Sequence, residues 1–367
     1  MQDTWLRPDA VFDGQDLREG CALRIEAGRV ADIVSGGDGE PLPGIVSPGY
    51  VDLQVNGGGG VLLNKTPDAA AMAEIAAAHR QFGTIGILPT VITDAPEVLG
   101  AAVEAAIAAR GTPGVLGLHI EGPHISVARR GTHAERFVRP MDATTLAHVK
   151  RLRSAGVPVM ITVAPEATTP GQIADLAAMG AVVSIGHSDA SAEAARATIA
   201  AGITAATHLF NAMSPMQNRE AGVVGAVINS NVTAGIIADG IHVADEMVGL
   251  AVRARPEPDR MFLVSDAMPT VGGPDHFELY GQELRLENGR LVNAEGSLAG
   301  AHLTVSTGAE RLVTRIGLDP QTALRMGITV PARLMGLGHL ARIKGRAAAD
   351  LIHLTRDLRF TGYITAP

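Results

Sequence analysis

Glu121 ends an apolar run, and its position is the first in this sequence to indicate chemistry. The run begins at Val115, reads Val-Leu-Gly-Leu-His-Ile-Glu and is followed by a Gly-Pro pair. Such a run predicts a buried parallel strand, and α/β folds bind their ligands beyond the carboxyl ends of these strands. A glutamate on its own there is more often the first solvated residue of a loop, so the assignment depends on partners elsewhere.

Three further ionisable residues stand at the ends of other candidate strands. His187 lies in Gly-His-Ser-Asp, His208 in Thr-His-Leu-Phe-Asn, and Asp266 in Ser-Asp. In a barrel of parallel strands the carboxyl ends form one ring, so these side chains would converge on a single site. Two histidines and one carboxylate match the ligands of a catalytic zinc site. Asp266 is then left as an acid–base group that takes a proton from water and passes it to a leaving group.

The alternation of apolar and Ala-rich segments predicts the barrel. Candidate strands cover residues 45–56, 84–92, 115–121, 158–166, 182–189, 205–213, 235–242 and 261–268, and helical patterns cover residues 68–82, 95–109, 142–155, 170–179, 191–201 and 244–255. This α/β pattern favours a (β/α)8 barrel over an open doubly wound sheet. Taken singly, each candidate residue could be a satisfied core histidine or a capping aspartate, but four of them at equivalent strand ends favour the metal site.

Both ends of the chain differ from this central region. Residues 1–44 show short alternating segments typical of β-hairpins, and residues 336–367 return to β character. We expect the two ends to form one small β-sandwich domain beside a catalytic barrel of residues 45–335. Within the barrel segment, residues 276–293 resemble a hairpin, residues 296–300 a Gly-rich turn, and residues 304–316 and 320–335 helices.

Composition narrows the function classes. Hydrophobic residues make up 46% of the 367 residues but aromatic ones only 3%, so the interior must be filled by Ala, Val, Ile and Leu, as in helices packed on parallel strands. A net charge of −8 without a basic block argues against a nucleic-acid partner. One cysteine allows no disulfide within the chain, and there is no secretory signal or apolar stretch of membrane-spanning length. A cytoplasmic protein without a membrane partner is therefore expected.

The remaining histidines carry weaker signals. His119 lies two residues before Glu121, so its side chain points to the same side but deeper, either supporting the site or filling the core. His124 lies in the following loop and is expected to be exposed. Structural or surface roles are expected for the others, which are His79, His148, His276, His302, His339 and His353.

Several blocks around these residues also carry a family resemblance. They occupy residues 48–57, 117–123, 131–133, 163–166, 186–188, 206–213, 237–242 and 263–267. In order over most of the chain, they resemble the N-acetylglucosamine-6-phosphate deacetylases of the amidohydrolase superfamily. The resemblance implies a (β/α)8 barrel with a β-sandwich from both termini, acting as a homodimer. It also implies hydrolysis of the acetamide of N-acetylglucosamine 6-phosphate to glucosamine 6-phosphate and acetate, in amino-sugar catabolism or recycling.

The resemblance assigns a role to each matching residue. Glu121, His187 and His208 become the metal ligands, and Asp266 the general base and then acid. His133 would polarise the acetamide carbonyl and stabilise its oxyanion. The residues that would hold the sugar phosphate, in part from the neighbouring subunit, are Thr132, Asn211 and Ala212 through their backbone, with Arg219 and His242. A turn of Leu298, Ala299 and Gly300 would close over the substrate.

Strand one suggests how many metals are bound. Many amidohydrolases carry His-x-His there, but this sequence reads Gln54-Val-Asn56. Neutral amides are poor ligands for transition metals, so the resemblance implies one divalent metal per subunit, with zinc favoured and iron, cobalt or manganese as alternatives. The sequence departs from the family at Met268-Pro269, at Ala301-His302 and in its short C-terminus. These departures affect what can be expected of the sugar and of the lid contacts, and not the expected class of reaction.

Two other functions fit parts of the pattern. A single-metal amidohydrolase could deacylate a different N-acyl substrate, such as an N-acyl amino acid; Arg219 and His242 favour a phosphorylated one. A barrel that has lost catalysis could serve as a scaffold. The intact set of one glutamate, two histidines and one aspartate argues against this alternative.

Overall fold

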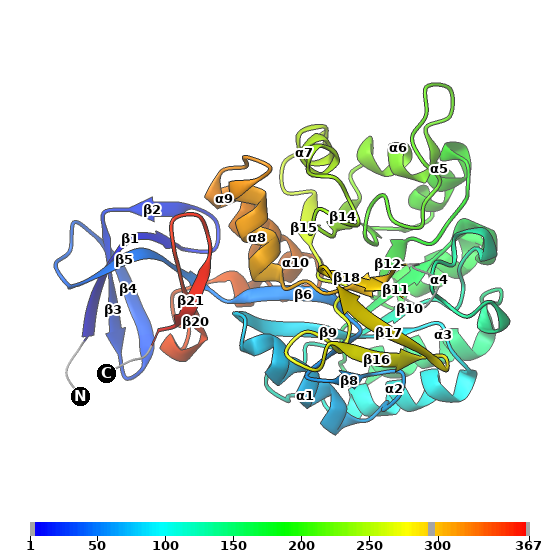
Figure 1. Ribbon diagram of the computed structural model, residues 1–367, viewed down its shortest axis with the longest axis horizontal. Coiled ribbons are helices and arrows are strands. Elements are labelled where there is room, and N and C mark those ends of the chain that lie inside the picture. Colours follow the sequence, from blue (N-terminus) through cyan, green and yellow to red (C-terminus); the bar gives the residue numbers. More distant parts are fainter. Residues whose placement is uncertain (1–3, 293–297, 365–367) are drawn as a thin grey trace.

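The computed structural model describes residues 4–292 and 298–364 (Figure 1). Its centre is the expected barrel, in which eight parallel strands pair in the order β15-β14-β13-β12-β11-β10-β9-β6. These strands are β6 (Tyr50–Val55), β9 (Thr84–Ile92), β10 (Leu118–Glu121), β11 (Val159–Val163), β12 (Val182–Ile185), β13 (Ala205–Ala206), β14 (Thr233–Ile236) and β15 (Met261–Leu263). The barrel closes beyond β15, where the Asp266 amide donates to the Gln54 carbonyl at 3.0 Å and the Asn56 amide to the Ala267 carbonyl at 2.9 Å.

Helices follow the strands, and six of those described begin at a side-chain cap that the sequence supplies. The helices are α1 (Ala69–Arg80), α2 (Pro96–Ala108), α3 (Ala143–Ser154), α4 (Pro170–Ala178), α5 (Ala192–Ala200), α6 (Gly222–Ile228), α7 (Asp245–Arg253), α8 (Val305–Thr314), α9 (Pro320–Leu324) and α10 (Val330–Leu334). Asp68, Asp142, Thr169 and Ser191 each accept an amide N–H in the first turn of the following helix. The sequence analysis missed α6, because its seven residues are all buried and no side chain caps it.

Most of the strands are shorter than predicted, whereas β9 has the predicted bounds. β12 and β13 end before His187 and His208. β14 begins at Thr233 and ends at Ile236, so the expected strand over 235–242 is wrong beyond residue 236. The apolar pattern continues into Ile237 and Ala238, which stay buried although the strand has ended. An apolar sequence pattern indicates which residues are buried, and here the buried segment extends beyond the end of the strand.

Both ends of the chain join one β unit, as expected. Its strands pair in the order β21-β20-β5-β1-β3-β4, with β2 on β1. They are β1 (Thr4–Phe12), β2 (Leu17–Glu19), β3 (Cys21–Glu26), β4 (Arg29–Ser35), β5 (Glu40–Pro48), β20 (Leu351–Leu354) and β21 (Phe360–Tyr363). Figure 1 shows the C-terminal strands, in red, beside the N-terminal ones, in blue. β5 crosses the proposed boundary after residue 44 and leads through Gly49 into β6.

A β-hairpin insertion follows β15 at the end of the barrel that carries the predicted site. It contains β16 (His276–Leu279), β17 (Gln282–Glu287), β18 (Arg290–Val292) and β19 (Leu298–Ala301) in one antiparallel sheet. The predicted hairpin is therefore present. Leu298–Gly300, expected in a turn, lie in strand β19: Leu298 pairs with Val292 of β18, and Ala301 at the end of the strand pairs with Arg290 and bridges to Ala267. The rest of that expected turn, residues 296–297, lies outside the described residues. No helix of the described ranges is both long and apolar enough to cross a membrane.

His79 makes the stability of this fold depend on pH. It lies on α1, is fully buried, and its Nε2 is 3.0 Å from the carbonyl oxygen of Gly57. Burial lowers the pKa of His79 to about 4. In the unfolded chain a histidine takes up its proton near pH 6.5. The stabilisation is therefore complete above about pH 6.5 and is lost as the pH falls toward 4.

We predict that His79→Gln, which can still donate to Gly57, weakens this pH dependence. Lowering the pH from 6.5 to 5 should destabilise the wild type by about 2 kcal/mol more than the variant, since one proton corresponds to about 1.4 kcal/mol per pH unit. Thermal melts at pH 7.5 and 5.0 measure the difference. The exposed His276→Gln is the matched control. An unchanged pH dependence in His79→Gln would contradict the assignment.

Candidate active site

The backbone leaves its strands abruptly where the predicted site residues stand. His187, His208 and Asp266 all adopt left-handed conformations, with φ of 48°, 30° and 50°. A non-glycine residue in this region costs about 1 kcal/mol or more, and such residues gather at functional sites. Glu121, the last residue of β10, does not adopt the left-handed conformation. The next residue, Gly122, has the positive φ, of 81°. These turns direct the four side chains toward the axis of the barrel.

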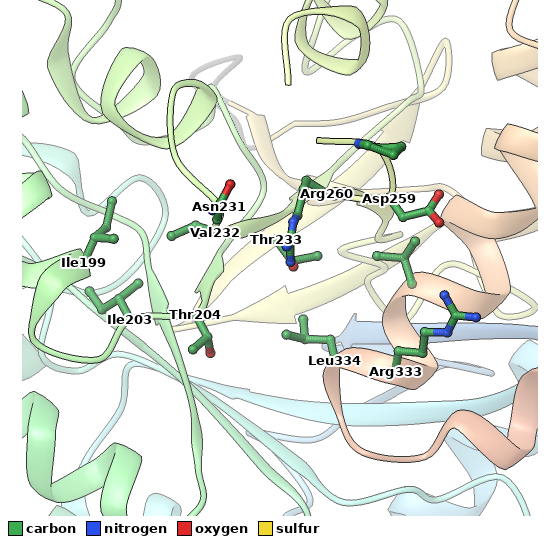
Figure 2. A pocket seen from close by; sticks show the side chains of 12 residues that line it. Ile199, Ile203, Thr204, Asn231, Val232, Thr233, Asp259, Arg260, Arg333 and Leu334 are labelled. Atoms are coloured by element: carbon green, nitrogen blue, oxygen red, sulfur yellow. The ribbon is translucent and has the colours of Figure 1, made fainter. Parts of the chain in front are cut away.

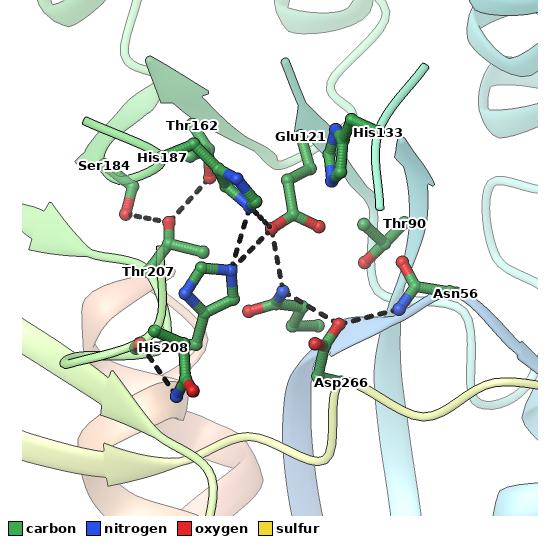
Figure 3. Close-up of polar contacts among 12 residues, drawn as sticks. Asn56, Thr90, Glu121, His133, Thr162, Ser184, His187, Thr207, His208 and Asp266 are labelled. Carbon is green, nitrogen blue, oxygen red and sulfur yellow. Dashed lines mark hydrogen bonds and ion pairs between the residues drawn. The ribbon is translucent and has the colours of Figure 1, made fainter. Parts of the chain in front are cut away.

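Three of these side chains bring one atom each to a single point (Figure 3). Oε1 of Glu121 lies 3.1 Å from Nε2 of His187 and 3.0 Å from Nε2 of His208, and the two nitrogens are 3.1 Å apart. All three residues are buried. Tetrahedral ligands at 2.0–2.1 Å from a zinc ion would lie about 3.3 Å from one another. The described chain therefore presents a donor set and spacing that fit one divalent metal ion.

A hydrogen bond behind His187 fixes how its ring points. Nδ1–H of His187 donates to the carbonyl oxygen of Arg129 at 2.9 Å, which leaves the lone pair of Nε2 facing the cluster. His133 also lies within reach, in a group with Glu121 and His187 whose ligand atoms are within 4.8 Å of one another. The set with His208 is tighter, so we take His208 as the third ligand and leave His133 for substrate.

The electrostatics of the cluster suit this division of roles. Burial raises the pKa of Glu121, but its hydrogen bonds with His187 and His208 outweigh burial and hold that pKa well below its ordinary value. Burial, followed by the nearby Glu121 charge, raises the pKa of Asp266 to about 6. Burial and then His187 lower the pKa of His133 to about 3. The site thus combines an ionised carboxylate, a basic aspartate and a neutral histidine.

Two amides hold Asp266 by a single oxygen. Nδ2 of Asn56 donates to Oδ1 of Asp266 at 2.7 Å, and Nε2 of Gln54 donates to the same oxygen at 3.0 Å. Nε2 of Gln54 also donates to Oε1 of Glu121 at 3.0 Å. Gln54 therefore joins Glu121 of the cluster to Asp266, and Oδ2 of Asp266 is the oxygen that these amides leave for other partners. The sequence analysis had treated both amides only as absent metal ligands.

A pocket of about 210 Å³ opens at this cluster. Of the predicted site residues it is lined by Glu121, Thr132, His133, His187, His208, Asn211, Ala212, His242, Asp266, Leu298 and Gly300. Others in its lining that the sequence analysis did not single out are Asn56, Ile92, Gly131, Ile237 and Met268. Ala299 does not line it, because alternate residues of a strand face opposite sides, and its side chain packs under the β-hairpin insertion.

Arg219 does not reach the pocket of its own chain. After Ala212 the chain turns back, and Met213 bridges to Ser188. It then runs outward, so residues 215–220 are all exposed, Arg219 among them. Direct phosphate binding by Arg219 within one chain is therefore not supported by this geometry.

The structure also decides the surroundings of two other histidines. His124 is fully buried, with Nδ1 3.1 Å from the Arg139 carbonyl and Nε2 2.9 Å from the Thr145 hydroxyl, so its predicted exposure is wrong. The loop that carries it folds back on α3. His119 is buried below Glu121 between the hydroxyls of Thr90, at 3.2 Å, and Thr162, at 2.8 Å.

A larger hollow of about 710 Å³ lies at the opposite end of the barrel (Figure 2). It is lined where the chain enters β13, β14 and β15 and by α10. Asp259 is the one carboxylate in its described lining, and Arg325 contacts it at 3.2 Å. The lining holds no histidine or glutamate, so the chemistry belongs to the smaller pocket.

Comparison with known proteins agrees with this geometry. Residues 45–363 match the amidohydrolase family. An N-acetylgalactosamine-6-phosphate deacetylase of Shewanella sp. (strain ANA-3) is 37% identical over 358 residues, covering 94% of this chain and 90% of that protein. An N-acetylglucosamine-6-phosphate deacetylase of Haemophilus influenzae is 31% identical over 326 residues, covering 87% and 84% of the two chains.

Solved structures show the same relationship. N-acetylglucosamine-6-phosphate deacetylase from Pasteurella multocida superposes with a TM-score of 0.89 at 30% identity, covering 98% of this chain and 97% of that one. A mutant of the Mycobacterium smegmatis enzyme in complex with N-acetyl-D-glucosamine-6-phosphate gives the same TM-score and identity over the full length of both chains. The chain therefore belongs to the amidohydrolase family.

Proposed function

We propose that this chain hydrolyses the acetamide of N-acetylglucosamine 6-phosphate to glucosamine 6-phosphate and acetate, in the catabolism or recycling of amino sugars. The observation that carries the proposal is the convergence of Glu121, His187 and His208 on one point beside Asp266. The pocket of about 210 Å³ lies below the usual range of about 300–1,000 Å³ for ligand sites, which suits one sugar unit. The names of the relatives supply the substrate class.

One divalent metal ion per subunit, with zinc as the first candidate, would be held by Glu121, His187 and His208. When bound, it would polarise the amide carbonyl and lower the pKa of a water. Gln54 and Asn56 turn their N–H groups toward Asp266 and Glu121, and neutral amide oxygens are poor ligands for a transition metal, so no second metal is proposed on strand one. One metal per chain is therefore proposed.

Asp266 is proposed as the proton carrier. Its Oδ2 accepts a proton from the water that attacks the acetyl carbon, and returns it to the sugar nitrogen as the C–N bond breaks. His133 is proposed as the donor to the carbonyl oxygen. Its Nδ1 lies 2.7 Å from the Thr93 hydroxyl, and when that hydroxyl donates to Nδ1 the ring proton is on Nε2, free to donate to the developing oxyanion.

Sugar and phosphate would be held around this centre. Backbone groups of Thr132, Asn211 and Ala212 are proposed to bind the sugar phosphate together with His242. Leu298 and Gly300 would close over the sugar, with Ala299 contributing only backbone. We also propose a cytoplasmic homodimer in which the exposed loop 215–220 carries Arg219 to the phosphate of the neighbouring copy, where its guanidinium can form charge-assisted bonds.

N-acetylgalactosamine 6-phosphate is the second candidate substrate, because the relative that is 37% identical is named for it. The two sugars differ only at carbon 4. Acetate release from a panel of N-acetylated sugar phosphates tests the proposal and ranks the two. Absence of acetate release from every phosphorylated N-acetylhexosamine by metal-loaded protein would overturn it.

We predict that Asp266→Asn keeps metal and substrate binding but lowers kcat by about 10²–10⁴-fold, the usual contribution of general acid–base catalysis. An asparagine can hydrogen-bond the water but cannot take its proton. Steady-state kinetics with metal analysis of the same preparation measure both effects. If a folded, metal-loaded Asp266→Asn retained more than a tenth of the wild-type rate, another group would be the base.

His208→Ala should release the metal, because only two protein ligands remain. Gln54→Ala should lower metal content far less, since Gln54 touches Glu121 as a hydrogen-bond donor and not the metal. Metal per chain after dialysis against a weak chelator measures both. Equal metal loss in the two variants would show that Gln54 is itself a ligand.

Arg219→Ala should lower kcat/KM for the phosphorylated sugar by about 10–10³-fold and leave the dephosphorylated sugar nearly unchanged. Mixing Arg219→Ala with Asp266→Asn protein tests the shared site. In mixed dimers the intact catalytic centre of one chain receives Arg219 from its partner, so activity on the phosphorylated sugar should rise above that of either variant. No recovery after subunit exchange would place Arg219 outside a shared site.

A further inference from the structure

Resting on the proposed function, we infer that Asp239 is a positioning residue for phosphate recognition: it locks the imidazole of His242 so that Nε2 faces the substrate. Asp239 lies three residues beyond β14, in the turn that carries His242 to the pocket. Phosphate preference would then depend on a carboxylate that does not itself touch the ligand.

The geometry of the turn leaves Asp239 no freedom. Nδ1–H of His242 donates to Oδ2 of Asp239 at 2.6 Å. Oδ1 accepts the backbone N–H groups of Ile241 and His242, both at 2.8 Å. The side chains of Asp239 and His242 are only 8% and 11% exposed, so this hydrogen bond is shielded from water. Burial raises the pKa of Asp239, but its bond with His242 outweighs burial and lowers it, which keeps the carboxylate charged.

Neighbouring residues hold the turn in place. Gly240 has a φ of 72°, and a Cβ at that position would collide with the guanidinium of Arg311. Arg311 is in turn fixed by Asp245, with Nε to Oδ1 at 2.7 Å and Nη2 to Oδ2 at 2.9 Å. The turn therefore packs against a braced side chain, and His242 is presented to the pocket in one orientation.

This arrangement determines what His242 offers to a ligand. With Nδ1–H committed to Asp239, Nε2 is the free nitrogen, and His242 lines the pocket. A carboxylate behind an imidazole fixes its tautomer and stabilises the imidazolium when it forms. The dyad can thus present a charge-assisted N–H to a phosphate dianion. Asp266 also interacts electrostatically with His242. The experiment must therefore separate phosphate binding by His242 from a role of His242 in the chemistry.

Asp239→Asn is the decisive variant, because the Asn carbonyl can still accept the two backbone N–H groups while the charge is lost. We expect KM for the phosphorylated sugar to rise about 5–30-fold, as a charge-assisted bond is replaced by a neutral one. kcat should stay within a factor of two, and kcat/KM for the dephosphorylated sugar should not change. Asp319→Asn is the matched control: it also removes a carboxylate charge while keeping an acceptor for a backbone N–H, that of Thr322 at 2.9 Å, but it lies outside the pocket lining and should leave the phosphate preference intact.

A double-mutant cycle tests whether Asp239 acts through His242. In a His242→Gln background, Asp239→Asn should have no further effect on KM. Equal losses on both sugars, or full additivity of the two substitutions, would overturn the inference. A wild-type chain that releases no acetate from any N-acetylhexosamine would instead overturn the proposed function. Calorimetric titration with inorganic phosphate would still test Asp239 in that case, since weaker binding by Asp239→Asn than by wild type is expected and equal binding would refute the role.

Discussion

The meeting of one carboxylate oxygen with two imidazole nitrogens inside the barrel is the constraint on which the rest of the site depends. Burying such groups is costly unless each finds a partner. Neighbours meet this demand for two of the three side chains: the Gln54 amide donates to Glu121, and the Arg129 carbonyl accepts from His187. The lone pairs of Glu121 Oε1 and of the two Nε2 atoms face one point, where a cation would be a partner for all three atoms.

The polar chain below the cluster supports the strand ends that carry it. The hydroxyl of Thr162 lies 2.6 Å from that of Thr207, which lies 2.7 Å from Ser184, and His119 adjoins the chain at Thr162. These buried hydroxyls satisfy one another across adjacent strands directly beneath His187 and His208. Left-handed residues at the strand ends cost free energy, so they persist only where surrounding contacts fix their conformation. This network and the apolar barrel core provide those contacts.

Sequence patterns predicted the parts of the molecule that follow from periodicity. Strand–helix alternation located the barrel, and the ionisable residues at strand ends located the site, because parallel strands end on one face. Sequence patterns were less informative where the surroundings of a side chain depend on how its loop packs against the rest of the protein. His124 was expected to be exposed but packs on α3. Arg219 lies on an outward loop, and its role at the phosphate stays a prediction. Asp239 could have been found from sequence, since Asp-Gly-Ile-His places a carboxylate three residues before a histidine within one turn.

The amides of strand one explain how Asp266 can remain basic in this setting. A cation next to a carboxylate lowers its pKa and so removes basicity, whereas a neutral amide orients the carboxylate without neutralising it. Gln54 and Asn56 together occupy Oδ1, while burial and the Glu121 charge raise the pKa of Asp266 to about 6. Amides in place of histidines on strand one thus orient Asp266 without placing a positive charge on that strand. A general base works best with a pKa near the working pH, so a carboxylate held by neutral amides suits the proton-carrier role proposed for Asp266.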